Sequence, residues 1–217
     1  MISSTEENYL KAVYALSQQE NQVSISDISA YLEVSKPSIN SMIKNLQAKA
    51  LVKYEKYKPI ELTAKGKEIA ALVVRKHRLT EMYLVNQMGF GWEEVHQIAE
   101  QMEHIKSPAL FDRMDELMGY PKTDPHGSPI PDKQGKITTR ALIPMSECEV
   151  GKEVRLVALE NSSDDFLAFL NSREISLGIS IRLISKEPFD RSITVDYLNK
   201  QNEVLSAKVC DRLLVSY

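Results

Sequence analysis

The sequence predicts an α+β protein in which a winged helix-turn-helix is followed by a helical segment and a small β-barrel. Three observations lead to this prediction. The first 60 or so residues combine helical periodicity with a hairpin signal, residues 64–117 carry apolar side chains at helical spacing, and beyond residue 139 the apolar residues alternate with a period of two. With 43% hydrophobic and 26% charged residues in 217, the chain can form one or two ordinary domains and a small third.

The N-terminal segment predicts helix, helix, turn, helix and hairpin in that order. Ser35 is placed to cap the third helix, and Pro37 falls in its first turn, where a missing N–H costs nothing. This is the element order of a winged helix-turn-helix. The expected elements are helices over 4–18, from 26 to about 33 and from 35 onward, and short strands over 51–55 and 60–63, joined through residues 56–59.

The third helix carries side chains suited to double-stranded DNA. One side is apolar, and the other presents short hydrogen-bonding groups for base edges and lysines for phosphates. Between Lys36 and Arg78 there are eleven basic and three acidic residues, although the chain as a whole has a net charge of −3. Such a basic segment is typical of a polyanion-binding surface, and a solvated polar face is the alternative. The candidate DNA-binding residues of this helix and of the hairpin are Ser35, Lys36, Pro37, Ser38, Asn40, Ser41, Lys44, Lys53, Lys56 and Lys58.

Histidines and carboxylates gather on the helices that follow. A long helix is expected from 63 or 64 to about 88, a second from 92 to about 105 and a shorter third after residue 107. The second carries His96, Glu100, Glu103 and His104 at offsets of 0, 4, 7 and 8, which place them on one face. Two imidazoles and two carboxylates would pack poorly in an apolar core, and their charges would repel one another on a surface. A divalent cation bound between them would remove both difficulties.

Further ligand-type residues lie outside this face. His77 and Glu81 stand four apart near the end of the long helix, and Asp124 and His126 lie in a Pro/Gly-rich loop over 119–131. Carboxylates and imidazoles without a thiolate suit Mn²⁺, Fe²⁺, Co²⁺ or Zn²⁺. The alternative for any single residue is a solvated polar side chain.

The C-terminal segment follows a linker over 132–140 and predicts a small β-barrel. Several short strands with turn signals between them are typical of such barrels. The strand candidates are 154–159, 179–184, 192–195 and 212–215, with one helix over 164–172.

Other classes of protein are disfavoured. Two cysteines without a CxxC motif argue against a disulfide scaffold, a zinc finger and an iron–sulfur cluster. The longest apolar run has about six residues, and the N-terminus lacks a secretory signal, so we expect a cytoplasmic protein without a membrane partner. A metallohydrolase would be an alternative use of helical His and Glu residues, but HExxH, HxxEH, a Gly-rich phosphate loop and a nucleophile motif are all lacking, so we expect no enzymatic activity.

Three segments, RKHRLTE at 75–81, HQIAEQMEH at 96–104 and PKTDPHG at 121–127, resemble the diphtheria-toxin-repressor family of metal-dependent transcriptional repressors. The resemblance covers essentially the whole chain and is to the long form with a C-terminal SH3-like domain. It implies a homodimer that binds a pseudo-palindromic double-stranded DNA operator and represses metal-uptake genes. It also implies three domains: a winged helix-turn-helix DNA-binding domain over 1–64, a helical dimerisation and metal-binding domain over 65–138, and an SH3-like β-barrel over 139–217.

The same resemblance implies which residues bind metal. The primary site would use Asn8 from the first helix with Glu100, Glu103 and His104. An adjacent site would be lined by His77, Glu81 and His96. Long manganese-responsive members build a second site from the loop, which here implies Asp124, His126, Glu81 and an acid of the barrel domain, for which Asp165 is our choice and Asp164 and Glu160 are the alternatives.

Departures from the family pattern bear on the metal. Glu100 stands where the iron branch has a cysteine, and this harder ligand favours Mn²⁺, with Fe²⁺ as the alternative and Co²⁺, Ni²⁺, Zn²⁺ or Cd²⁺ as substitutes in vitro. Asn8 is a neutral, weaker ligand where the manganese branch commonly has Asp. Lys11 replaces a glutamate ligand of some short manganese members, so we expect no two-metal cluster of their type. The alternatives to a manganese repressor are an iron-dependent repressor of the same family and a metal-independent winged-helix regulator.

Overall fold

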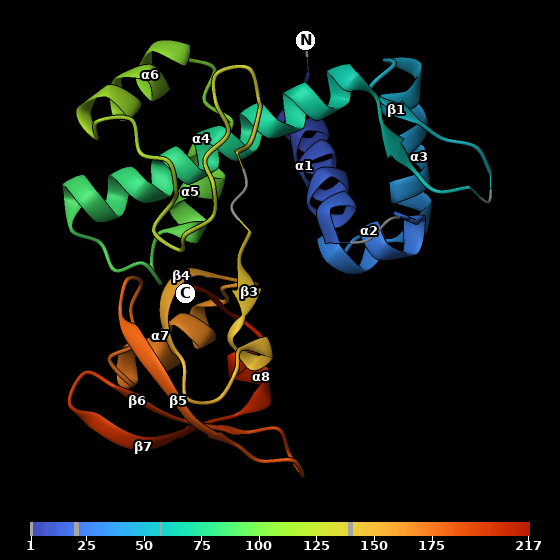
Figure 1. Ribbon diagram of the computed structural model, residues 1–217. Coiled ribbons are helices and arrows are strands. Elements are labelled where there is room, and N and C mark those ends of the chain that lie inside the picture. The colour runs from blue at the N-terminus through green and yellow to red at the C-terminus, as the bar shows by residue number, and fades with distance from the viewer. Residues whose placement is uncertain (1, 20–21, 57, 139–140) are drawn as a thin grey trace. The chain divides into compact units, whose positions relative to one another are not determined.

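The computed structural model describes residues 2–19, 22–56, 58–138 and 141–217 (Figure 1). The chain divides into two compact units, which are described separately here. The first unit comprises Met1–Thr80, Gln97–Tyr120 and Ile130–Thr138, and the second comprises Glu81–His96, Pro121–Pro129 and Thr139–Tyr217. The three-domain division stays a prediction, and its boundary at residue 139 lies outside the described residues.

The first unit opens with the predicted winged helix-turn-helix, seen in blue to cyan in Figure 1. Ser24 caps the second helix in a reciprocal capping box with Asp27. Ser35 holds the predicted N-cap position of the third helix, but its hydroxyl lies 3.0 Å from the Ser38 hydroxyl and caps no backbone N–H. Tyr57, in the predicted hairpin connection, lies outside the described residues. The elements are α1 (Ser4–Gln19), α2 (Ile25–Leu32), α3 (Lys36–Ala48), β1 (Val52–Lys53) and β2 (Glu61–Leu62).

A continuous apolar core holds these elements together. Leu10 of α1, Ile28 of α2 and Ile43 of α3 are all fully buried in it. Each such side chain stabilises the unit by about 1.5–3 kcal/mol relative to an exposed position. Burial of the apolar side of α3 leaves its polar side in solvent, as the sequence predicts.

Three further helices follow: α4 (Ala64–Met88), α5 (His96–Met102) and α6 (Pro108–Leu117). The prediction for α5 was too long at both ends. Trp92 lies in a turn instead, because its ring packs on the apolar core of the second unit and its Nε1 donates to Asn171 at 2.8 Å. Glu103 and His104 lie in the turn that follows α5, although Glu103 N still donates to the Ala99 carbonyl at 2.9 Å.

The second unit contains an antiparallel six-stranded sheet in the order β3-β8-β4-β5-β6-β7. The four predicted strands are present as β4, β5, β6 and β8, but β3 and β7 were missed. The segment forming β7, KQNEVL, is polar because it pairs only with β6 and buries only Leu205. The elements are β3 (Ile143–Pro144), the 3-10 turn η1 (Met145–Glu147), β4 (Glu153–Leu159), α7 (Asp164–Ser172), β5 (Ser180–Lys186), β6 (Ile193–Tyr197), β7 (Lys200–Leu205), α8 (Ala207–Cys210) and β8 (Leu213–Ser216).

None of the helices in the described ranges has the length and apolar composition that crossing a membrane requires.

Candidate metal centre and nucleic-acid interface

A buried group of ligand-type side chains lies in the second unit. Glu81, Asp124 and His126 each place one ligand atom within 4.8 Å of the others, and their exposures are 3%, 5% and 5%. His126 Nδ1 lies 3.9 Å from a Glu81 oxygen and 3.9 Å from an Asp124 oxygen. Metal–ligand bonds of about 2.0–2.2 Å allow one ion to touch atoms up to about 4.4 Å apart. The two distances from His126 Nδ1 therefore fit a single shared cation.

Backbone contacts fix the loop that carries Asp124 and His126. The N–H groups of His126 and Ser128 both donate to Asp124 Oδ1 at 2.9 Å. Gly127 has a φ of 88°, and a Cβ there would lie 2.3 Å from the Val157 carbonyl oxygen, so only glycine fits. The loop is thereby held directly against β4.

The orientation of the His126 ring supports a metal site. Its Nε2 lies 2.9 Å from the backbone carbonyl of Trp92, which can only accept a hydrogen bond, so Nε2 carries the proton. In a neutral imidazole Nδ1 then presents its lone pair to the carboxylates of Glu81 and Asp124. A histidine held in this way by a carbonyl is the usual arrangement around a bound metal.

Glu81 also contacts His96. Its second oxygen, Oε1, lies 3.2 Å from His96 Nδ1, and the His96 side chain is half exposed. His77 precedes Glu81 by one helical turn on α4. The structure therefore brings Glu81 and His96 of the implied adjacent site together within the second unit.

Glu103 is the central group of the first unit's candidate site. It is 1% exposed, and its two oxygens face different partners. Oε2 accepts a hydrogen bond from Lys11 Nζ at 2.7 Å and lies 2.6 Å from His77 Nδ1, whereas Oε1 lies 3.7 Å from His104 Nε2. Burial disfavours the charged form, but the hydrogen bond from His77 and the charge of Lys11 outweigh it, so the pKa of Glu103 lies below its ordinary value. Glu103 is therefore a buried, ionised carboxylate at neutral pH.

His104 is oriented by a residue that the sequence analysis missed. Its Nδ1 lies 2.6 Å from Glu7 Oε2, and both side chains are largely buried. An ionised carboxylate only accepts, so Nδ1 donates and Nε2 is left to face Glu103. The sequence signal that could have pointed to it is the acidic first turn of α1, formed by Glu6 and Glu7.

Other candidate ligands are more exposed. Asn8 on α1 and Glu100 on α5 are both exposed. Asp165, like its rival Asp164, is exposed in the first turn of α7, and Glu160 is exposed after β4. Among the described residues, the close group around His126 contains only Glu81 and Asp124 beside it, so a barrel-domain ligand stays a prediction.

The polar side of α3 is open to solvent. Of the ten candidate DNA-binding residues, only Asn40 is half buried, because its Oδ1 accepts a hydrogen bond from Tyr54 OH at 3.3 Å. This contact joins the helix to the hairpin. Tyr54 was not among the predicted functional residues. Lys58 forms an exposed ion pair with Glu55 at 2.5 Å. The exposed candidates are Ser35, Lys36, Pro37, Ser38, Ser41, Lys44, Lys53, Lys56 and Lys58.

A buried carboxylate joins α1 to the end of α3. Glu6 is 3% exposed, and its Oε1 accepts hydrogen bonds from Asn45 Nδ2 at 2.7 Å and Lys49 Nζ at 2.5 Å. Its Oε2 accepts from the Ser3 N–H at 3.0 Å. The hydrogen bond from Lys49 is the main reason that the pKa of Glu6 is lowered. Consecutive residues of α1 thus contact the candidate DNA-binding helix α3 and, through Glu7, the candidate metal ligand His104.

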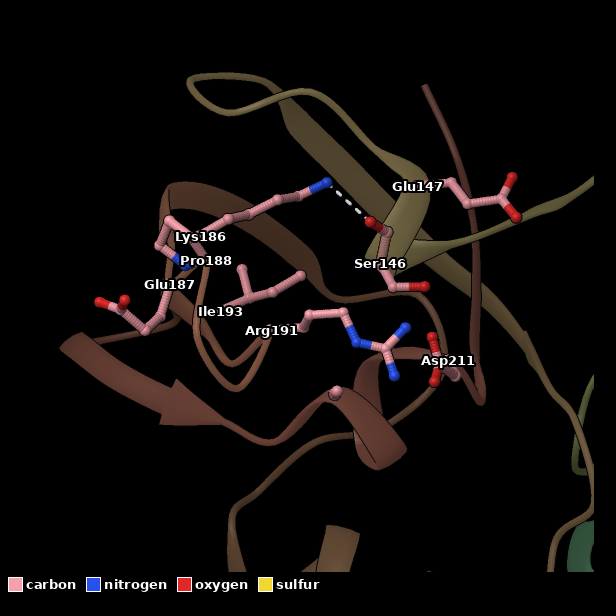
Figure 2. A pocket seen from close by; sticks show the side chains of 9 residues that line it. Ser146, Glu147, Lys186, Glu187, Pro188, Arg191, Ile193 and Asp211 are labelled. Carbon is pink, nitrogen blue, oxygen red and sulfur yellow. Dashed lines mark hydrogen bonds between the residues drawn. The ribbon is translucent and has the colours of Figure 1, made fainter.

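The second unit also has a surface pocket of about 420 Å³ beside the β5–β6 connection (Figure 2). Lys186 crosses it to donate to the Ser146 carbonyl at 2.7 Å, and Arg191 points toward Asp211. Its lining mixes both signs of charge and lacks histidine and cysteine. It therefore offers no donor set comparable to that around His126.

These features define a class of protein. A winged helix-turn-helix with an exposed basic helix, combined with buried histidine–carboxylate groups, characterises metal-responsive DNA-binding regulators.

Comparison with known proteins agrees with this class. The chain matches three family models: the iron dependent repressor N-terminal DNA binding domain over residues 1–60, the iron dependent repressor metal binding and dimerisation domain over 63–132, and the FeoA domain over 143–217. The HTH-type transcriptional regulator MntR of Geobacillus thermodenitrificans is 32% identical over 54% of this chain and 83% of its own length. The chain belongs to the family of metal-dependent, DNA-binding transcriptional repressors that includes the diphtheria toxin repressor.

Individual relatives differ in the metal that their names give. The iron-dependent repressor IdeR of Mycobacterium leprae is 35% identical over 58% of this chain, and the match spans 55% of IdeR, so the chain covers about half the length of this relative. The diphtheria toxin repressor of Corynebacterium diphtheriae is 26% identical over 93% of this chain and 92% of its own length. A solved manganese-dependent transcriptional repressor in complex with manganese superposes with a TM-score of 0.86 at 29% identity, covering 97% of this chain and 98% of that one.

Proposed function

We propose that this chain is a metal-dependent transcriptional repressor that binds double-stranded DNA as a homodimer and controls metal-uptake genes, with Mn²⁺ as its physiological metal. The observation that carries the proposal is the buried group of Glu81, Asp124 and His126, in which an imidazole lone pair faces two carboxylates. The bound ion would supply the positive charge that joins these groups. Iron as the physiological metal is the alternative, since IdeR is named as iron-dependent.

The donor chemistry supports Mn²⁺ over softer ions. The candidate ligands are carboxylates, imidazoles and one amide, which suit hard and borderline cations. Both cysteines, Cys148 and Cys210, are buried in the apolar core of the second unit, and burial raises the pKa of each thiol. Neither is placed to serve as a thiolate ligand, and the structural relative named above is a manganese-dependent repressor.

The link from metal to DNA would run through α1. Glu7 orients His104, and Glu6 holds Asn45 and Lys49 near the end of α3. Ordering His104 and Glu103 around an ion would fix α1, and α1 would fix α3 for entry into the major groove. A tenfold gain in DNA affinity requires a coupling free energy of about 1.4 kcal/mol.

The decisive experiment measures DNA affinity of the purified chain with and without Mn²⁺. A duplex selected by the Mn²⁺-loaded protein from a random pool serves as the probe, and the affinity is expected to fall steeply with salt because lysines contact phosphates. Glu103→Ala should abolish the gain from Mn²⁺, whereas Glu116→Ala, at an exposed acid of the same unit, should keep it. An unchanged dissociation constant with and without metal would refute the proposal.

The identity of the physiological metal is tested by comparing DNA affinity in Fe²⁺ and in Mn²⁺, anaerobically and at matched free metal concentrations. Activation by Mn²⁺ at lower free concentration supports a manganese repressor. Activation by Fe²⁺ alone would make the chain an iron repressor of the same family.

A further inference from the structure

A lysine ammonium lies inside the first unit's candidate metal site. Lys11 Nζ is 2.7 Å from Glu103 Oε2 and 3.2 Å from His77 Nδ1. The Lys11 side chain is only 17% exposed, and that of Glu103 is 1% exposed. The ammonium therefore sits among groups that the family resemblance assigns to metal.

The contact has a clear physical reason. An ionised carboxylate removed from water is costly unless a positive charge compensates it. Lys11 supplies that charge from α1, across a sequence separation of 92 residues. The buried carboxylate of Glu103 is thus neutralised without a metal ion.

A divalent cation at Glu103 would compete with this ammonium. Both are attracted to the same carboxylate, and they repel each other at the few ångströms that separate neighbouring ligand positions. Glu103 and His104, whose Oε1 and Nε2 atoms lie 3.7 Å apart, would hold the metal, which would then share the Glu103 carboxylate with the ammonium.

We propose that Lys11 is a tethered cation that competes with the divalent metal for Glu103 and thereby sets the metal concentration at which the protein responds. This inference rests on the proposed function in taking Glu103 as a metal ligand. No covalent step is involved, since one positive charge replaces another beside the same carboxylate.

The ammonium has a second acceptor within reach when it leaves Glu103. Glu7 precedes Lys11 by four residues on α1, the spacing at which a glutamate and a following lysine pair best on a helix. Glu7 uses Oε2 for His104 Nδ1, and its carboxylate has a second oxygen that can receive Lys11. Transfer of Lys11 from Glu103 to Glu7 would keep the ammonium paired in both states.

The test is Lys11→Met, which keeps the aliphatic stem and removes the charge. The proposal expects two effects of opposite sign. Mn²⁺ should bind the Glu103 site at least about tenfold more tightly, a change within the range seen when groups around metal ligands are altered. The metal-free protein should melt at a lower temperature, because Glu103 loses its counter-ion. A lysine that merely supports the structure would lower both metal affinity and melting temperature.

Mn²⁺ binding is measured by the electron paramagnetic resonance signal of free Mn²⁺. All variants carry His126→Ala as well, so that the group of Glu81, Asp124 and His126 is impaired and the binding measured is that at Glu103. Lys11→Arg is the matched control, since it keeps the charge and should not tighten binding. Unchanged or weaker Mn²⁺ binding by Lys11→Met would overturn the proposal.

One further variant separates this inference from the proposed function. If Glu103→Ala leaves Mn²⁺ binding intact in the same background, the assignment of Glu103 as a ligand fails, and the role of Lys11 fails with it. The proposed function would then still be decided by the DNA affinity measured with and without Mn²⁺. If Glu103→Ala abolishes binding while Lys11→Met does not strengthen it, only the role of Lys11 is refuted.

Discussion

Replacing Glu6 by glutamine tests whether α1 is the mechanical link to α3, the candidate DNA-binding helix. Glu6 is buried and holds Asn45 and Lys49 at 2.7 and 2.5 Å. Glutamine keeps the size and one acceptor oxygen but removes the charge. We therefore expect a weaker attachment of α1 to α3 without a change of fold.

The expected loss of unfolding free energy follows from the environment of each contact. Hydrogen bonds to a buried charge contribute about 1.5–3 kcal/mol, and their neutral counterparts about 1. Lys49 is 40% exposed, so its share is reduced toward the value of a surface pair, about 0.5 kcal/mol. Loss of a negative charge in the first turn of α1 adds about 0.5 kcal/mol. The sum is about 2 kcal/mol for Glu6→Gln.

Glu116→Gln is the matched control. Glu116 pairs with Arg113 at 2.6 Å, but both side chains are more than half exposed, so the same substitution should cost less than about 0.5 kcal/mol. Urea unfolding of the metal-free variants, followed by far-ultraviolet circular dichroism, gives both values. Hydrogen exchange of the α3 amides should accelerate only in Glu6→Gln. Equal losses in the two variants would refute the reasoning, because burial would then not decide the strength of the contact.

Three further predictions follow from the sites. Glu7→Ala should weaken Mn²⁺ binding at His104 by about 10- to 100-fold, and Glu7→Gln should retain part of the Mn²⁺ affinity, as measured by calorimetry. Equal Mn²⁺ affinity of the unaltered protein and both variants would contradict the orienting role of Glu7. His126→Ala should lower the number of Mn²⁺ ions bound per chain by one. It should also remove the effect of Mn²⁺ on the fluorescence of Trp92, the only tryptophan of the sequence, whose ring stacks on that of His126 at a centroid distance of 6.1 Å. An unchanged number of bound ions would argue against a metal site at His126. Burial raises the pKa of the Cys210 thiol to about 12, above its ordinary value of 9.0, so the stability that this thiol contributes is complete below pH 9 and is lost as the pH rises toward 12. A thiol reagent at pH 8 should therefore label Cys210 only after the protein unfolds. Fast labelling of the native protein would contradict the burial.

The helices and most strands were predictable because their signals are local. The apolar periodicity of α1, α3 and α7 and the glycines after α4 lie within each segment itself. The β7 strand was missed because an edge strand with one buried residue has no alternating pattern to detect. The start of α5 was misplaced because Trp92 is held by Asn171, which lies 79 residues away.

The candidate site was predictable by residue type but not by geometry. Spacing placed His96, Glu100, Glu103 and His104 on one helical face, yet α5 ends at Met102, and Glu103 and His104 turn toward α1. Whether Glu7 or Asn8 meets His104 depends on the rotation of α1 about its own axis. The apolar periodicity of α1 indicates that Leu10 and Val13 are buried, but it does not indicate where the distant residue His104 lies relative to that core.

The first helix gathers three such distant contacts into a stretch of six residues. Glu6 meets Asn45, Glu7 meets His104 and Lys11 meets Glu103, at sequence separations of 39, 97 and 92. Neighbouring residues of a helix point about 100° apart and residues four apart share a face, so Glu7 and Lys11 face the candidate metal ligands while Glu6 faces α3. A rotation of α1 that improves one contact must therefore strain another. The candidate metal ligands and the candidate DNA-binding helix α3 would thus be coupled through the orientation of α1 alone, without any direct contact between them being required.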